Sequence, residues 1–387
     1  MRKLSVIALV MFMAFTCSIV ANAMEVMELG GEVDVLWTGL LQDDGAFDSE
    51  LTESLNLELF PSPLGSSEVR YEFLLTKPIQ GLFSGHESSY FTKKLYVKHK
   101  FEHFHLTLGR QPISWSFGSL LNPVDYTLGA VALDEESRSK YTDALEVYLP
   151  VNWNSGVDFV FSFPKGFDVD LDALKWGVRG RWGVKGYDVT VNYVQEAASS
   201  EGMGFGAATT SSPGDLFGGL FPRQRMGATV KGDIGNLGVY GALGRYFECD
   251  GSTKSSMGYL LGADYSYDLD YFTKITMQLE YLGMELNSLA PSIKTQFLKM
   301  DPSDNRLDLL MGRVSYPIDD FSTASLVSMV NLDDGSLLLG PSYKSTLGGD
   351  IDLVLAGSVL MGKEDTLFGP GGLMPQATVS VGLSYAF

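Results

Sequence analysis

Apolar and polar residues alternate along most of this chain, in segments of about ten residues separated by turns and loops. The last segment shows the pattern most clearly, because one parity is small or polar while the other carries Val379, Val381, Leu383, Tyr385 and Phe387. Successive side chains of a β-strand point to opposite faces, so a period of two predicts strands with one apolar face and one polar face.

The pattern predicts about 18 strands. They cover 29–41, 51–60, 67–76, 91–102, 104–112, 140–150, 156–164, 174–184, 187–196, 224–234, 237–248, 257–268, 271–284, 305–316, 321–332, 335–346, 350–361 and 376–387. A count of about 16 is the alternative, because the two faces of 321–332 differ little and Pro341 removes a ladder donor from 335–346.

The connections distinguish a membrane barrel from a soluble sandwich, which also alternates. Tight turns at 102–104, 184–186 and 234–236 alternate with long connections such as 77–90 and 111–139. Short turns at one end and long loops at the other are typical of an outer-membrane barrel, whereas a sandwich mixes both lengths at both ends. The sequence therefore predicts an all-β, transmembrane, antiparallel up-and-down β-barrel, closed because the bilayer leaves no sheet edge hydrated.

The first 23 residues predict export. Arg2 and Lys3 form a basic start, an apolar run follows, and Ala21-Asn22-Ala23 is a small-residue cleavage site. We expect a signal peptide at 1–23 and a barrel at 24–387. A lipoprotein cut before Cys17 is disfavoured by the bulky residue Phe15 close to that position.

Composition supports this picture and excludes one class of partner. The chain has 43 glycines, 18 tyrosines and 23 phenylalanines but only 19% charged residues, and its formal net charge is −19. Aromatic, glycine-rich strands fit a membrane barrel, and the negative charge repels phosphates, so no nucleic-acid partner is expected.

Two short stretches resemble known outer-membrane proteins. The terminal Phe387, after apolar residues at every second position, resembles the signal that such barrels present to the barrel-assembly machinery. The stretch Gly109-Arg110-Gln111, with Trp115 and then Asn122-Pro123-Val124-Asp125, resembles one that follows an early strand in the porin and alginate-export-like superfamily of Gram-negative bacteria. The resemblance covers about 20 residues and implies a porin-like channel in the cell outer membrane, without naming a solute.

The alternation of side chains along each predicted strand indicates which residues line the interior, because every second residue points to the same face. Two basic ladders, one on 91–102 and one on 174–184, share the polar face with carboxylates, and so many inward charges require water in the lumen. The predicted pore-lining residues are Lys94, Lys98, Lys100, Arg110, Lys175, Arg179, Arg181, Arg70, Glu72 and Glu146. Arg110 has the parity of Leu106 and Leu108, so it reaches the lumen only if a β-bulge forms at Gly109.

The connection 111–139 is the predicted constriction loop, because it is long, follows an early strand and is rich in polar residues. Its candidate residues are Trp115, Asn122, Asp125, Asp134, Glu135, Glu136 and Arg138. The alternative for this connection is a solvated external loop.

The predicted function is a porin that passes small hydrophilic solutes or ions passively, with outer-membrane lipids around it. The alternatives are a structural or adhesive barrel with a plugged lumen, and a barrel enzyme; the sequence contains neither a Gly-x-Ser-x-Gly elbow nor a phosphate-binding loop. We expect no catalytic residue, cofactor or metal, because three of the four histidines, His99, His103 and His105, surround one tight turn without a second carboxylate or a cysteine. Many porins are homotrimers, but no patch in the sequence identifies a trimer interface.

Overall fold

The computed structural model describes residues 27–63, 65–77, 89–115, 117–120, 122–126, 141–163, 174–196, 224–247, 255–270, 273–286, 305–364, 366–370 and 375–387. The expected signal peptide at 1–23 lies outside these ranges. So do Asp134, Glu135, Glu136 and Arg138 of the predicted constriction loop.

The described chain forms 18 antiparallel strands, which confirms the predicted count. They are β1 (Met27–Leu41), β2 (Phe47–Pro61), β3 (Ser67–Thr76), β4 (Ser89–Lys100), β5 (His105–Pro112), β6 (Tyr141–Asn152), β7 (Ser155–Ser162), β8 (Lys175–Val184), β9 (Tyr187–Gln195), β10 (Gln224–Ile234), β11 (Leu237–Phe247), β12 (Ser256–Asp268), β13 (Lys274–Glu285), β14 (Arg306–Asp319), β15 (Ser322–Asn331), β16 (Leu337–Gly348), β17 (Ile351–Met361) and β18 (Ala377–Ala386). Both strands that the sequence left in doubt are present, as β15 and β16. Pro341 lies inside β16, opposite Leu326 of β15.

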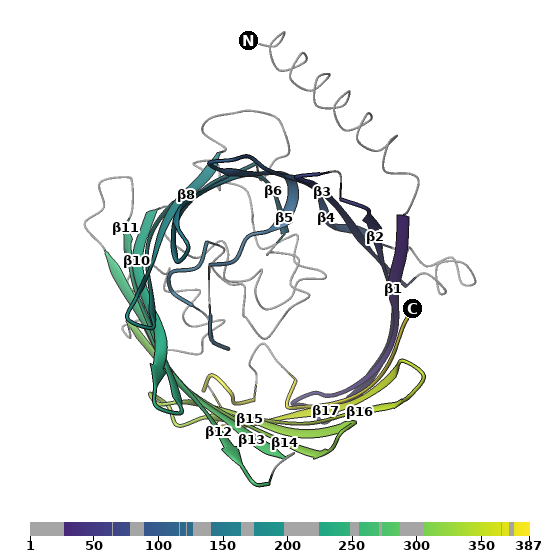
Figure 1. Cartoon of the computed structure of the whole chain (residues 1–387). Helices are drawn as coiled ribbons and strands as arrows, with labels where there is room; N and C mark the ends of the chain where they lie inside the picture. The colour runs from purple at the N-terminus through teal and green to yellow at the C-terminus, as the bar shows by residue number, and fades with distance from the viewer. Residues whose placement is uncertain are drawn as a thin grey trace.

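The strands form one closed ring, because each pairs with its neighbours in sequence and β1 pairs with both β2 and β18 (Figure 1). Phe387 continues the closing ladder beyond β18. Its N–H donates to the carbonyl oxygen of Gly31 at 2.9 Å, and the N–H of Gly31 donates back to Phe387 at 3.0 Å. No edge strand is left with unpaired backbone groups, which a membrane-embedded sheet requires.

The turns at one end of the barrel are as short as predicted. Lys185 and Gly186, between β8 and β9, both have positive φ, of 50° and 88°. Two successive left-handed residues form the tight turn that matches the twist of a hairpin. Met27, where β1 begins, and Phe387, which follows β18, lie at the same end of the barrel as this turn.

The outer surface of the ring carries a belt of large apolar side chains that face away from the protein. Representative members, one or more from most strands, are Val35, Leu95, Val191, Val230, Leu243, Leu261, Leu279, Val314, Leu326, Leu355, Val379 and Leu383, all strongly exposed. A contiguous apolar surface of this extent is stable only against lipid, so the belt fits the hydrocarbon core of a bilayer. Among the described residues, no helix is long and apolar enough to cross a membrane.

The lipid-facing assignment makes a prediction on two adjacent residues of β17. Leu355 lies in the belt beside Val381, and Ala356 points to the other face beside Ser380. Leu355→Arg should lower the free energy of unfolding in lipid vesicles by about 2–4 kcal/mol, because it places a charge near the middle of the bilayer. The matched Ala356→Arg should cost much less, and equal losses in urea titrations followed by tryptophan fluorescence would contradict the assignment.

Candidate functional site: the barrel interior and its inward loop

Hydrogen bonds between polar side chains of neighbouring strands identify the inner face of the ring. The Ser54 hydroxyl of β2 donates to the Asp34 carboxylate of β1 at 3.1 Å, and Asp34 lies opposite Ser384 of β18. These residues line a recess of about 490 Å³ together with Glu32, Thr52 and Lys344. Hydroxyl, carboxylate and ammonium groups therefore share the lining of this recess with apolar side chains such as Leu36, Leu74 and Val354, on the wall formed by β16–β18 and β1–β3.

The predicted basic ladders occupy this inner face. Residues that lie directly opposite one another on neighbouring strands share a face of the sheet. Glu72 of β3 lies opposite Lys94 of β4, and Thr107 of β5 lies opposite both Lys98 of β4 and Glu146 of β6, so all of these residues share the inner face. It then continues to β8, where Arg179 lies opposite Asp158 of β7. By register parity the inner face includes the predicted Lys94, Lys98, Lys100, Lys175, Arg179, Arg181, Arg70, Glu72 and Glu146.

Several of these residues are joined in ion pairs. Arg179 lies 2.8 Å from the Asp158 carboxylate, and Arg70 lies 2.7 Å from that of Glu68. Lys94 contacts Glu72. Positive and negative side chains of the inner face thus partly neutralise one another, both between neighbouring strands and along one strand.

Arg110 differs from the other predicted lining residues. Gly109 has a φ of 126°, a region that favours glycine, but neither ladder of β5 shifts register there. Arg110 stays opposite Leu95 and Asp143, with a guanidinium nitrogen 3.8 Å from the Asp143 carboxylate. The bulge that would turn Arg110 toward the lumen is not formed, so Arg110 keeps the parity of outward-facing Leu95.

Lys93 is an inner residue that was not among the predicted ones, and in a regular strand it would share the outer face with Leu95. The ladder between β3 and β4 shifts register after Glu72, and this β-bulge adds one residue to β4. As a result both Lys93 and Lys94 reach Glu72, Lys93 at 3.5 Å, and Lys93 is buried. A bulge depends on the partner strand, so the sequence of β4 contained no signal for it.

The described part of the 111–139 connection lies inside the ring, on the side of β8, β10 and β11 (Figure 1). We call residues 113–115, 117–120 and 122–126 the inward loop. Asp125 shapes it, because its carboxylate accepts the backbone N–H groups of Trp115 and Tyr126, each at 2.7 Å. Asn122 makes a second tight turn by accepting the N–H of Val124 at 3.0 Å. The predicted residues Trp115, Asn122 and Asp125 are therefore brought together and buried.

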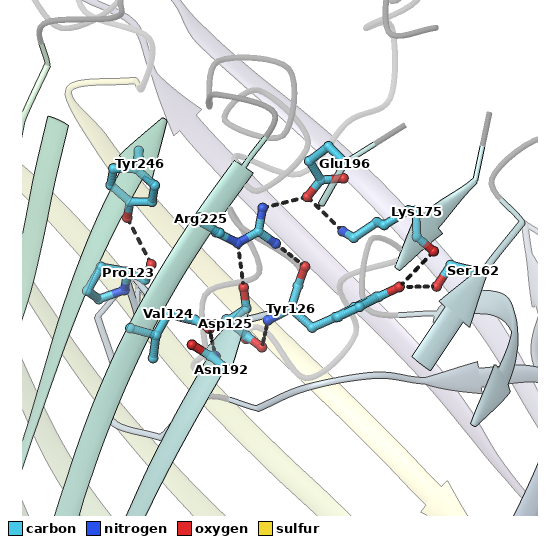
Figure 2. A network of polar contacts seen from close by, with 10 residues as sticks. All are labelled: Pro123, Val124, Asp125, Tyr126, Ser162, Lys175, Asn192, Glu196, Arg225 and Tyr246. Atoms are coloured by element: carbon cyan, nitrogen blue, oxygen red, sulfur yellow. Dashed lines mark hydrogen bonds and ion pairs between the residues drawn. The ribbon is translucent and has the colours of Figure 1, made fainter. Parts of the chain in front are cut away.

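One end of the inward loop is bound to the wall by a buried charge cluster (Figure 2). Arg225 of β10, 2% exposed, donates to the carbonyl oxygens of Asp125, at 3.0 Å, and of Tyr126. Arg225 also pairs with Glu196 at 2.6 Å, and Lys175 reaches the same carboxylate at 3.0 Å. Burial pushes the pKa of Glu196 upward, but the two cations outweigh burial and lower its pKa below the usual range.

Further contacts hold the same end (Figure 2). The Tyr126 hydroxyl lies 2.6 Å from that of Ser162, and the Lys175 ammonium lies over the Tyr126 ring at 4.5 Å. Asn192 donates to the carbonyl oxygen of Val124, and the Tyr246 hydroxyl donates to that of Pro123 at 3.0 Å. Backbone carbonyls that would otherwise be buried without a donor are thereby satisfied from three strands of the wall, β9, β10 and β11.

The middle of the inward loop is bound at a second point, Glu280 of β13, which is completely buried. One carboxylate oxygen accepts the N–H of Ser119 and the other accepts that of Leu120, each at 2.7 Å. The Tyr240 hydroxyl also donates to this carboxylate. The inward loop therefore crosses the wall from β8 to β13 and is tied down at both places.

Glycines on the wall make room for this path. A Cβ atom at Gly227 would lie 2.2 Å from a methyl group of Val124, and one at Gly244 would lie 2.7 Å from the carbonyl oxygen of Pro123. A Cβ atom at Gly177 would lie 2.9 Å from the Trp115 ring. The glycine-rich composition thus has a local reason on β8, β10 and β11, where the loop backbone approaches the sheet closely.

The inner wall also carries an apolar cluster that the sequence analysis did not predict. Its core includes the inner residues Leu260, Leu282, Met284, Leu309, Met311 and Leu360, with Leu120 and Val124 from the inward loop. Phe117 and Leu367 pack against it. The inward loop therefore covers an apolar part of the wall, while the described recesses lie along β1–β4 and β16–β18.

A closed antiparallel ring with an apolar exterior and a charged interior defines a membrane-spanning β-barrel. No protein-family model and no curated protein matches this chain. Solved structures similar to it include an engineered porin of Rh. blastica, at 12% identity over 94% of this chain and 100% of that one, with a TM-score of 0.46. The anion-selective porin from Comamonas acidovorans has 13% identity over 94% of this chain and 99% of that one, with a TM-score of 0.47. A loop-deletion mutant of OmpT, an outer membrane protein of Vibrio cholerae, has 9% identity over 94% of this chain and 99% of that one, with a TM-score of 0.46.

Proposed function

We propose that this protein is a passive channel of a bacterial outer membrane that admits small hydrophilic solutes and ions. The observation that carries the proposal is the lining of charged side chains around the inner face. Arg179, paired with Asp158, and Arg181 lie on β8. Asp352, paired with Lys344, lies on β17, which is half of the 18-strand ring away. Opposed charges on a wet wall orient water and favour polar solutes over apolar ones.

The inward loop is the proposed constriction. It occupies lumen volume on the side of β8–β13, and its buried hydrogen bonds hold it against that wall. Solutes then pass along the remaining wall, where the recess lined by Asp34, Thr52 and Lys344 lies. Phe387 is proposed to serve the barrel-assembly machinery during insertion.

The apolar cluster on the inner wall keeps a second candidate function, a structural barrel with a closed lumen, in consideration. Purified protein in planar lipid bilayers separates the two functions, because a channel produces stepwise increases in conductance and a closed barrel does not. We expect steps. A membrane that stays silent at every protein density would refute the channel.

The basic ladders make the ion selectivity testable. Replacing Lys94, Lys98, Lys100, Lys175, Arg179 and Arg181 by Gln should shift the reversal potential in a salt gradient toward that of cations. The expected gain in permeability of cations over anions is about tenfold, because the field of the wall sets local ion concentrations. A control that replaces Lys185, in a turn, and Arg245, which lies beside outward-facing Met257, should leave the reversal potential unchanged. If the reversal potential of the six-residue variant equals that of the control variant, the basic ladders do not line the pore.

A further inference from the structure

A second recess, of about 260 Å³, lies on the inner face of β2–β4 near the short-turn end of the barrel. Its inner side chains come from all three strands and carry both signs of charge: Glu58, Phe60, Glu68, Arg70, Glu72, Lys94 and Tyr96. The recess is smaller than a drug-sized site, so it suits a solute of few atoms.

The carboxylates of the recess are unequally compensated. Glu58 lies directly opposite Glu72 in the ladder between β2 and β3. Glu72 is neutralised by Lys93 and Lys94 from its other side. Glu58 has no direct hydrogen bond or ion pair to any other residue that the structure describes, and only the more distant charges of Arg70 and Lys94 act on it. Like charges opposite one another destabilise a sheet, so a cationic group beside Glu58 would be favourable.

Arg70 offers the complementary feature. Its Nε donates to Glu68 at 2.7 Å, and its guanidinium lies over the Phe60 ring at 4.9 Å. These contacts orient the group and leave its two terminal nitrogens without a partner among the described residues. A guanidinium edge of this kind matches the two oxygens of a carboxylate.

The spacing joins the two features into one site. Arg70 is two residues from Glu72, so it is a diagonal neighbour of Glu58, at about 7–8 Å between Cα atoms. Both side chains reach the same recess from there, and the Tyr96 ring lies opposite Arg70. The recess thus presents one free anion and one free guanidinium edge to a small solute.

We propose that this recess is a transit site for zwitterions of the α-amino-acid type, with the solute carboxylate on Arg70 and its ammonium on Glu58. With Lys93, the recess holds three carboxylates and three cations, so a solute without net charge adds none, whereas a simple cation or anion satisfies only one of the two groups. The proposal rests on the proposed channel function and specifies its solute class. Binding in a channel has to be weak enough for release, so the site speeds passage rather than trapping the solute.

The test measures uptake by proteoliposomes of four solutes of similar size, at a mildly acidic pH below the pKa of the serinamide amino group: serine as the zwitterion, serinamide as the cation, glycerate as the anion and erythritol as the uncharged reference. For the wild type, we expect the highest rate relative to erythritol for serine. Glu58→Gln and Arg70→Gln should each lower the ratio of serine to erythritol about fivefold, the size expected of one partly exposed ion pair. Arg70→Lys should recover part of the ratio, because it keeps the charge and loses the planar edge.

Asp350→Asn is the matched control, because it removes one negative charge at the same end of the barrel. Its left-handed backbone, with a φ of 64°, tolerates asparagine. The serine ratio should not change in this variant. Equal serine ratios in wild type, Glu58→Gln and Arg70→Gln would overturn the site, and so would a loss confined to serinamide or to glycerate. Absence of erythritol uptake by the wild type would instead refute the channel itself.

Discussion

Arg225→Met is expected to destabilise the folded barrel more than any other single substitution of an inner residue considered above. The methionine side chain has similar volume but leaves Glu196 with Lys175 alone and the carbonyl oxygens of Asp125 and Tyr126 without their donor. Breaking a buried pair by removing one partner costs about 3–5 kcal/mol, because an uncompensated charge stays buried. Denaturant titration in detergent micelles measures this loss as a lower midpoint of unfolding.

The same variant should change the current through single channels. Once Arg225 no longer holds Asp125 and Tyr126, this end of the inward loop can leave the wall and enter the path of ions. We expect an open-channel current that switches between sublevels where the wild type is steady. Arg181→Met is the control, since Arg181 is exposed on the same inner face and has no ion pair among the described residues. Equal midpoints and equally steady currents for wild type and Arg225→Met would show that Arg225 does not anchor the loop.

Glu280→Gln should loosen the middle of the inward loop. Both carboxylate oxygens accept backbone N–H groups, from Ser119 and Leu120, and an amide can offer an oxygen to only one of them. The other N–H then faces an NH₂ group, and a buried donor left unsatisfied costs about 1–3 kcal/mol. Hydrogen exchange measures the effect directly, as faster exchange of the Ser119 and Leu120 amides.

The control for this prediction is Glu50→Gln, which alters an exposed carboxylate paired with Lys77. It should leave the exchange of Ser119 and Leu120 unchanged. Unaltered protection of both amides in Glu280→Gln would mean that other contacts hold this part of the loop. The Arg225 and Glu280 variants together report whether one end and the middle of the inward loop are fixed independently, because their effects should then add.

Alternation was sufficient to predict the strands, but it does not say which face is inward where both parities are apolar. In β14 the run Leu307, Leu309 and Met311 lies on the inner face, although Leu310 beside it is also apolar. A period-two pattern separates faces by contrast in polarity, and this run has little contrast. The inner apolar cluster was therefore visible only once the register and the covering inward loop were known.

Arg225 and Lys93 show two further limits of the sequence. In the sequence Arg225 is one basic residue among others of a predicted strand, 224–234, yet in the structure it anchors a loop a hundred residues earlier in the chain. Lys93 was absent from the predicted lining residues, because a one-residue bulge against Glu72 cannot be inferred from the bulged strand alone. Both outcomes depend on partners distant in sequence.

The sequence by itself determined the ring of strands, their order and the short turns, because these depend on local alternation, turn residues and the need of a sheet in lipid to close. The recesses, the path of the inward loop and the anchors at Arg225 and Glu280 were decided by the tertiary structure. They depend on which side chains of separate strands come into register and on the space that small residues such as Gly227 leave for another segment. Contacts of that kind join residues about a hundred positions or more apart, and no pattern within a single strand contains them.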